Sequence, residues 1–130
     1  HHNVINTKLY EYKDLYAMLE RMPSNEGRSL TFKVKKEFHQ QFKVKFEHYF
    51  SDYYDLYSKD DFLKLGFLGD INKYGYNQRL DDFLGDFIAI ASNELYLEYV
   101  DFKDDAFHFK SAHAGITKNE METPLIIIKK

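Results

Sequence analysis

The sequence contains no cysteine, which excludes disulfide bonds and metal sites built on thiolates. A metal ion bound here would need His, Asp or Glu ligands, and the chain has only 6 His. Its 2 Pro and 6 Gly form no linker that would divide the 130 residues into separate parts. We therefore expect one domain, or one piece of a larger domain, over residues 1–130.

Long hydrophobic runs are also missing. No apolar stretch approaches the roughly 18 residues of a membrane span, and no signal-peptide pattern opens the chain. The formal charge of -3 comes from interspersed acids and bases, without the basic stripe that binds nucleic acid. These absences predict a cytoplasmic protein that binds neither membranes nor nucleic acid.

Aromatic residues are abundant, with 11 Tyr and 12 Phe, and most recur at helix or strand spacing. Apolar residues from Tyr12 to Met22 follow a helical period, which predicts a helix over about 10–21 that ends before Pro23. A second aromatic stripe predicts a helix over about 36–50. Between them, alternation over 30–34 is typical of a half-buried strand.

Other parts of the chain offer shorter signals. Ser58 with Asp61, and Thr117 with Glu120, have the spacing of helix caps. "PSNEG" and "DINKYGYNQR" are predicted to be a turn and a loop. The segments on either side of Ser92-Asn93-Glu94 predict a hairpin over Phe87–Val100.

The run Leu125 to Ile128 is apolar at every position, which is typical of a strand covered on both faces. The chain supplies few strands to surround it. We therefore expect an α/β fold that is part of a bigger protein. A small free-standing α+β sandwich is the alternative.

Four segments together resemble a known family. "RMPSNEGRSLTFKVK", "YSKDDFLKLGFLG", "RLDDFLGDFIAIA" and "HAGITKNEMETPLIII" are similar, in this order, to the C-terminal part of bacterial alkaline phosphatase superfamily proteins. Those that resemble type I phosphodiesterases and nucleotide pyrophosphatases are the best match. The resemblance runs from about Tyr10 onward and implies the C-terminal part of a three-layer αβα fold.

In that family, Asp and His residues hold two divalent ions, usually zinc, and a Thr or Ser nucleophile attacks phosphorus. The last His ligand of the family precedes the final strand, and the matching residue here is His113. The family's nucleophile and paired Asp-His motif lie upstream and have no match in this chain. The resemblance thus implies a segment without catalytic or cofactor-binding residues of its own, inactive alone and binding no metal alone. Its partners would be the upstream remainder of a parent phosphohydrolase and a phosphodiester or nucleotide-like substrate.

The remaining histidines are weaker candidates. His39 and His48 lie on the aromatic helix, and His108 lies between two phenylalanines of strand-like sequence. His1-His2 is either the remainder of an affinity tag or the trailing edge of the upstream metal motif.

An acidic cluster of Asp81, Asp82 and Asp86 lacks the spacing of a calcium loop, so we expect it to serve helix ends and strand edges. The alternative for the whole chain is a non-catalytic α+β module for interaction or oligomerisation. If the chain is part of a larger sheet, the open edges of that sheet would favour self-association.

Overall fold

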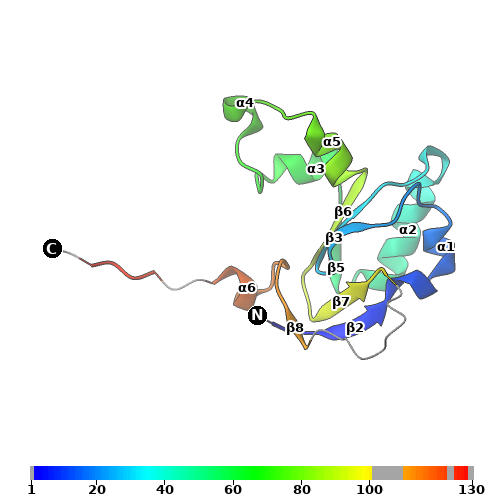
Figure 1. Ribbon diagram of the computed structural model, residues 1–130, viewed down its shortest axis with the longest axis horizontal. Helices are drawn as coiled ribbons and strands as arrows, with labels where there is room; N and C mark the ends of the chain where they lie inside the picture. The colour runs from blue at the N-terminus through cyan, green and yellow to red at the C-terminus, as the bar shows by residue number, and fades with distance from the viewer. Residues whose placement is uncertain (1, 101–109, 123–124, 129–130) are drawn as a thin grey trace.

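The computed structural model describes residues 2–100, 110–122 and 125–128, and its strands form three sheets (Figure 1). The largest has four antiparallel strands in the order β3-β4-β6-β5: β3 Ser24–Glu26, β4 Ser29–Phe32, β6 Phe87–Ala91 and β5 Tyr54–Ser58. A parallel pair joins β2 Ile5–Lys8 to β7 Leu95–Glu98. An antiparallel pair joins β1 His2–Asn3 to β8 Ser111–Ala112. The described residues therefore form a mixed α/β fold, which confirms the predicted α/β class in general terms.

The helices are short except for one. They are α1 Lys13–Tyr16, α2 His39–Phe50, α3 Lys59–Lys64, α4 Ile71–Tyr74, α5 Arg79–Leu84 and α6 Lys118–Met121, with 3-10 turns η1 Leu9–Glu11 and η2 Lys36–Phe38. Within the described residues, no helix is both long enough and apolar enough to cross a membrane.

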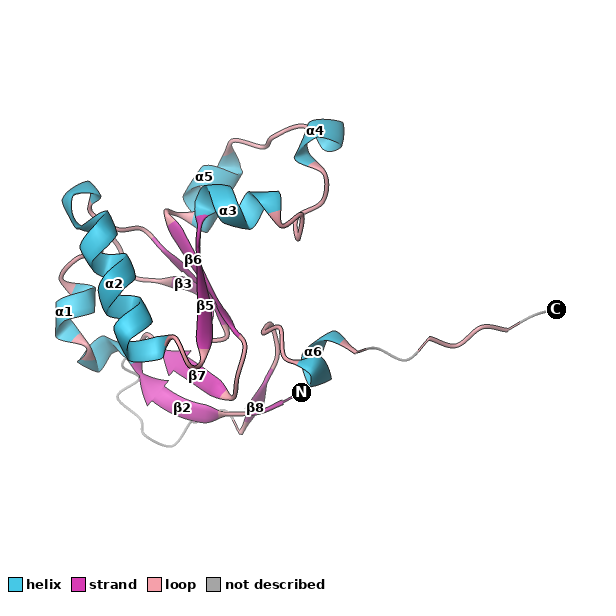
Figure 2. Ribbon diagram, turned by 180° about the vertical axis from the view of Figure 1, so that it is seen from behind, coloured by secondary structure: helices cyan, strands magenta, loops and turns pink. Residues whose placement is uncertain are grey.

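The main core lies between α2 and one face of the four-stranded sheet (Figure 2). Phe42, Phe46 and Phe50 come from one stripe of α2 and are almost fully buried. They meet Phe32 of β4 at ring-centroid distances of 5.2 Å from Phe42 and 5.4 Å from Phe46. The helix predicted over 36–50 is confirmed: α2 covers 39–50, the 3-10 turn η2 covers 36–38, and the aromatic stripe of α2 packs into the core.

A smaller cluster lies on the other face of the sheet. Phe62 of α3 and Leu84 of α5 pack with Ile88 and Ile90 of β6. The predicted cap of α3 is confirmed, since the Ser58 hydroxyl accepts a hydrogen bond from the Asp61 amide at 3.2 Å. These elements explain why all five residues of β6 are buried: both faces and both edges of the strand are covered.

Three predictions for individual segments are wrong in part. The helix expected over 10–21 is reduced to η1 and α1, because the chain then pairs with the strand region: Leu19 bridges Val34, and the Lys35 amide donates to the Met18 carbonyl at 2.8 Å. "PSNEG" is not only a turn, since it contains β3. "DINKYGYNQR" contains α4 and enters α5.

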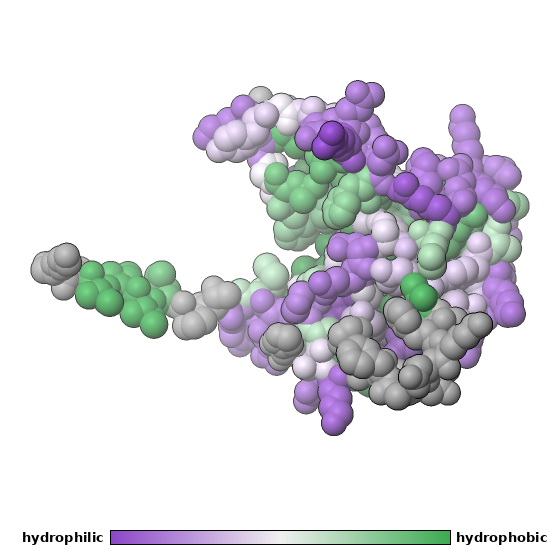
Figure 3. Space-filling model, in the orientation of Figure 1, coloured by the Kyte–Doolittle hydropathy of each residue, from purple (hydrophilic) through white to green (hydrophobic). Residues whose placement is uncertain are grey.

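The hairpin predicted over Phe87–Val100 does not form. β6 already has β4 and β5 on its two edges, so β7 pairs with β2 in a different sheet. The run Leu125–Ile128 is also not a buried strand. It has no regular secondary structure, its side chains are 72–85% exposed, and it projects from the rest of the molecule (Figure 3).

Candidate functional site

His113 lies in the loop between β8 and α6, and this loop is attached to the four-stranded sheet. The Ile116 amide donates to the Ala91 carbonyl at 2.8 Å, and the Ile116 side chain packs against the smaller core. Ala114 has a φ of 76°, in the left-handed region that side chains with a Cβ rarely adopt. Such a conformation costs about 1–3 kcal/mol and persists only where the surroundings enforce it.

The end of the loop is closed by the predicted capping box. The Glu120 carboxylate accepts from the Thr117 hydroxyl at 2.6 Å, the Thr117 amide at 3.2 Å and the Gly115 amide at 3.0 Å. The Glu120 side chain thus accepts all three of these hydrogen bonds at the end of the loop. Thr117 and Glu120 have the capping role expected from their spacing.

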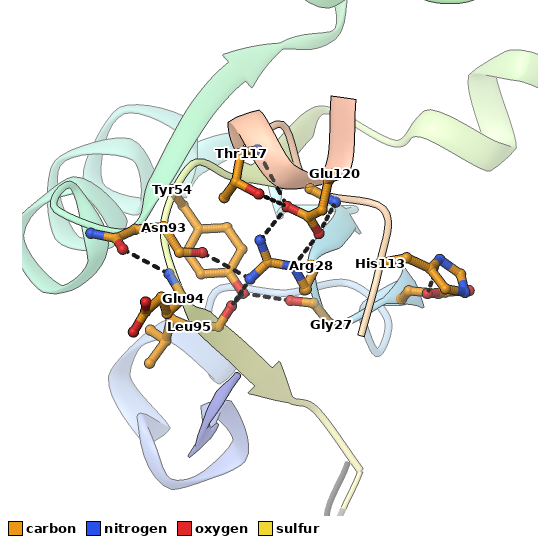
Figure 4. A network of polar contacts seen from close by, with 11 residues as sticks. Gly27, Arg28, Tyr54, Asn93, Glu94, Leu95, His113, Thr117 and Glu120 are labelled. Carbon is orange, nitrogen blue, oxygen red and sulfur yellow. Dashed lines mark hydrogen bonds and ion pairs between the residues drawn. The ribbon is translucent and has the colours of Figure 1, made fainter. Parts of the chain in front are cut away.

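Glu120 also has a partner far away in the sequence. The guanidinium of Arg28 is fully buried, and it donates to Glu120 through Nε at 2.7 Å and through Nη2 at 2.6 Å (Figure 4). Its Nη1 donates to the carbonyls of Asn93 at 2.8 Å and Leu95 at 3.0 Å. This two-pronged geometry is the strongest form of an Arg–carboxylate contact. We call Arg28 and Glu120 the clamp.

The charge of Glu120 is set by two opposing effects. Burial disfavours the ionised carboxylate, but the hydrogen bonds from Arg28, Thr117 and the Gly115 amide outweigh burial and lower the pKa to about 2. At neutral pH the clamp is therefore a pair of buried opposite charges, with both partners hydrogen-bonded.

Gly115 allows the loop to approach the clamp. A Cβ at this position would lie 2.5 Å from Arg28 Nη2, 2.6 Å from Glu120 Oε2 and 2.7 Å from the Ala91 carbonyl oxygen. Real Cβ atoms do not approach other atoms this closely. A glycine is thus required at position 115, because the backbone there lies in close contact with the clamp.

Arg28 lies in the tight turn between β3 and β4, and this turn is fixed by its neighbours. The Gly27 carbonyl accepts from the Tyr54 hydroxyl at 2.5 Å and from the Leu97 amide at 3.2 Å. Burial raises the pKa of Tyr54 well above its ordinary value, so the phenol keeps the proton that it donates. The turn and the loop thus form one packed unit.

Glu26, on the other side of Gly27, faces His113. Its Oε2 lies 3.4 Å from Nδ1 of the imidazole, and the two side chains are 47% and 60% exposed. A cavity of about 330 Å³ adjoins them and is lined by Asn25, Glu26, Tyr96, Tyr99, Ser111, Ala112 and His113. Unlike the clamp, this pair lies at the surface, where an ion pair contributes about 0–1 kcal/mol.

The pairing of β1 with β8 determines where β1 lies relative to the His113 loop. His2 lies opposite Ala112 and Asn3 opposite Ser111, so β1 lies beside the residues that immediately precede His113. Segments far apart in the sequence therefore meet beside the candidate ligand.

The other sequence candidates lie elsewhere. His39 packs edge-on against Phe87, and His48 lies against Tyr49 on α2. Asp81 and Asp82 occupy the first turn of α5, as expected for helix-end residues. His108 lies outside the described residues.

Asp86 has the strand-edge role that was predicted, and it accepts from the Val34 amide at 2.9 Å and from Lys33 at 3.0 Å. Within the described ranges, no group of three or more His, Asp or Glu residues comes together to hold a metal ion. His113 and Glu26 are two possible metal ligands, whereas a stable zinc site needs about four ligands. The described residues thus do not form a complete zinc site by themselves.

Glu26 and Arg28 were not identified from the sequence, where "PSNEG" indicated only a turn. Arg28 follows a glycine next to a strand, a pattern that many surface arginines share. Its partner is 92 residues away.

No family model, curated protein or solved structure matches this chain.

Proposed function

We propose that this chain is the C-terminal portion of a metal-dependent phosphohydrolase of the alkaline phosphatase superfamily, acting on a phosphodiester or nucleotide-like substrate. In this proposal His113 contributes one ligand to a divalent ion, zinc by preference, which would polarise the phosphoryl group. The remaining ligands and the nucleophile come from an upstream part of the parent protein, whose sheet completes a three-layer αβα fold.

The observation that carries the proposal is the register of β1 with β8. His2 lies opposite Ala112, so β1 lies beside the segment that leads into the His113 loop. The resemblance places an Asp-His metal motif upstream, so such a motif in a longer chain would arrive beside the loop histidine. The exposed apolar run Leu125–Ile128 gives further support, because it lacks in the described structure the covering that a larger sheet would provide.

The test is His113→Ala in the longer protein, assayed by turnover of a nitrophenyl phosphodiester with added zinc or manganese. A loop imidazole that is 60% exposed contributes little packing, so the thermal midpoint should hardly change. Turnover should fall by on the order of 100-fold or more, because an ion that loses a ligand is poorly bound and positioned.

His39→Ala is the matched control, since this histidine packs on α2 away from the loop. It should leave turnover near wild type. Near-normal turnover in His113→Ala, or a loss explained by a collapsed midpoint, would contradict the proposal. So would an upstream coding sequence with no Asp-His motif and no Thr or Ser nucleophile.

A non-catalytic interaction module is the second candidate. Three neighbouring side chains after α3 are about half exposed, namely Leu65, Phe67 and Leu68, at 49%, 51% and 47%. Exposed apolar side chains in such a group are typical of contact surfaces. A start codon adjacent to Asn3 would favour this candidate.

A further inference from the structure

The two edges of the four-stranded sheet differ in what they offer to another strand. β3 forms one edge, and its three residues are all polar, with a left-handed φ of 73° at Asn25. β5 forms the other edge, and its five residues include Leu56 and Tyr57 (Figure 2). Short, polar and irregular edges resist the addition of a strand, whereas longer edges with apolar side chains favour it. Of these two edges, β5 is therefore the one suited to pairing.

The backbone of β5 has hydrogen-bonding groups that β6 does not use. The Ser92 amide donates to the Tyr53 carbonyl at 2.9 Å, and the Lys59 amide donates to the Asp86 carbonyl at 3.0 Å. Because bonding alternates along an antiparallel ladder, the amide and carbonyl of Leu56 point away from β6. In the part of the chain that the structure describes, no backbone hydrogen bond reaches these outward groups.

Side chains on both faces of the sheet are apolar beside this edge. Leu56 packs against the main core on the α2 side, and Tyr57 packs against the smaller cluster on the α3 side. After α3, the side chains of Leu65, Phe67 and Leu68 are about half exposed. Figure 3 shows apolar side chains facing the hollow between the α3 region and α6. A strand added to β5 would thus need apolar residues on both of its faces.

We propose that the β5 edge is the docking site for the run Leu125–Ile128 of a second copy of this chain, which adds as an antiparallel strand. The run is apolar at every position, and its side chains are 72–85% exposed. In its own chain it projects away from the sheet, so reciprocal exchange between two copies gives each run an edge to pair with (Figure 1). Such an exchange closes a two-fold symmetric dimer. This inference goes beyond the proposed function and involves neither His113 nor a metal ion.

The distribution of charge favours the antiparallel direction. The run is followed in the sequence by Lys129-Lys130, and the start of β5 has Asp52 before it and Asp55 within it. At the other end of β5, Lys59 and Lys64 offset the acidic residues of α3. An antiparallel run brings its two lysines to the acidic start of β5, where opposite charges attract.

The first test exploits the absence of cysteine, because Lys130→Cys then provides a single attachment site for a nitroxide spin label. The spin-labelled chain, without isotope, is mixed with the 15N-labelled native chain, so that broadening of amide signals reports contacts between copies alone. The amides of Tyr54–Ser58 should broaden, most strongly near Tyr54. The amides of Ser24–Glu26 on the opposite edge should keep their intensity.

A second sample carries the spin label and 15N in the same chain and is measured at a concentration where the chain is monomeric. Broadening of β5 in this sample alone would mean that each run docks on its own chain, and it would overturn the inference. Broadening centred on β3, or none at β5 in the mixed sample, would also overturn it. Stronger broadening at Ser58 than at Tyr54 would overturn the antiparallel direction.

The second test measures dimerisation by sedimentation velocity in variants of the run. Ile126→Pro and Ile127→Pro each keep an apolar side chain but lose an amide donor. Only alternate amides of a strand face its partner, so one of the two variants should weaken dimerisation by about 10-fold or more and the other by less. Ile126→Val keeps the amide and is the control. Because the run lies outside both cores, these changes leave the folded chain intact. Equal effects of the two prolines would overturn strand pairing.

The acceptor edge is tested by Asp55→Lys, which places a like charge beside the lysines of the docked run. Dimerisation should weaken by about 3–10-fold. Glu26→Lys makes the same charge reversal on β3 and is the matched control, which should leave dimerisation unchanged. Circular dichroism shows whether each variant is folded. Unchanged dimerisation in folded Asp55→Lys, or a native chain that is monomeric at every concentration, would overturn the inference.

Discussion

Replacing Glu120 with glutamine should strongly destabilise the chain at neutral pH. The substitution keeps the shape of the side chain but leaves the buried Arg28 guanidinium without a counter-charge. Removing one partner of a buried ion pair costs about 3–5 kcal/mol, because the remaining charge stays desolvated.

The pH dependence gives an independent magnitude. The pKa of Glu120 falls from the ordinary value of 4.5 to about 2 in the folded chain. At about 1.4 kcal/mol for each pH unit, this difference corresponds to on the order of 3 kcal/mol of stability. Because the folded-state pKa is the lower one, this contribution is fully present above about pH 4.5. It is lost as the pH falls toward 2.

Urea unfolding of wild type and Glu120→Gln at several pH values between 7 and 2 would check this prediction. The free energies of unfolding should differ by on the order of 3 kcal/mol from pH 7 to 5, and the difference should shrink steadily below pH 4.5. Glu122→Gln is the control: this carboxylate is 68% exposed and pairs with Lys118, so its loss should cost under about 1 kcal/mol.

Two results would refute the reasoning. One is a Glu120→Gln variant as stable as wild type at pH 7, which would mean that the Arg28 charge is not buried in solution. The other is a difference that stays constant down to pH 2, which would mean that the carboxylate does not titrate as the clamp requires. If Glu120→Gln does not fold, Arg28→Met with Glu120→Leu replaces both charges with apolar groups. This double variant should recover part of the lost stability, because no unpaired buried charge remains, although the Asn93 and Leu95 carbonyls lose the donor that Arg28 supplies.

Two further predictions concern the core and the exposed run. Phe46→Ala should lower the free energy of unfolding by about 3–5 kcal/mol, since the ring is 1% exposed and lies between Phe42 and Phe50. A loss under about 1 kcal/mol, measured by urea unfolding, would show that Phe46 is not packed in the core. The chain should self-associate at high concentration in sedimentation, and Ile126→Lys with Ile127→Lys should shift it toward monomer, because both side chains are more than 70% exposed. A wild-type chain that stays monomeric throughout would contradict the second prediction.

Local signals in the sequence predicted local structure well. The stripe of α2, the cap at Ser58 and the capping box of Thr117 and Glu120 each depend on residues a few positions apart, and each is present. Of the candidate site, the sequence indicated His113 and its capped loop exit through the resemblance and the cap spacing. The structure adds the two side chains from the β3–β4 turn.

The wrong predictions have a common physical cause, which is competition between local pattern and distant partners. The residues after α1 have a helical period, but their backbone groups bond to Lys33 and Lys35 instead. β7 follows β6 after a short turn, yet β4 and β5 already occupy both edges of β6. Arg28 could not be assigned a partner because Glu120 lies 92 residues away, and no local spacing encodes that contact.

The parallel pairing of β2 with β7 also determines when the chain can complete its fold during synthesis. Ile5 is made well before its partner Leu95, and all four strands of the antiparallel sheet lie between them in the sequence. The helix α2 and the strands β3 to β6 can meet while the ribosome is still extending the chain, whereas β2 must wait for β7 to emerge. Pairings between distant segments form slowly, so β2 stays exposed to chaperones and proteases until β7 has been made.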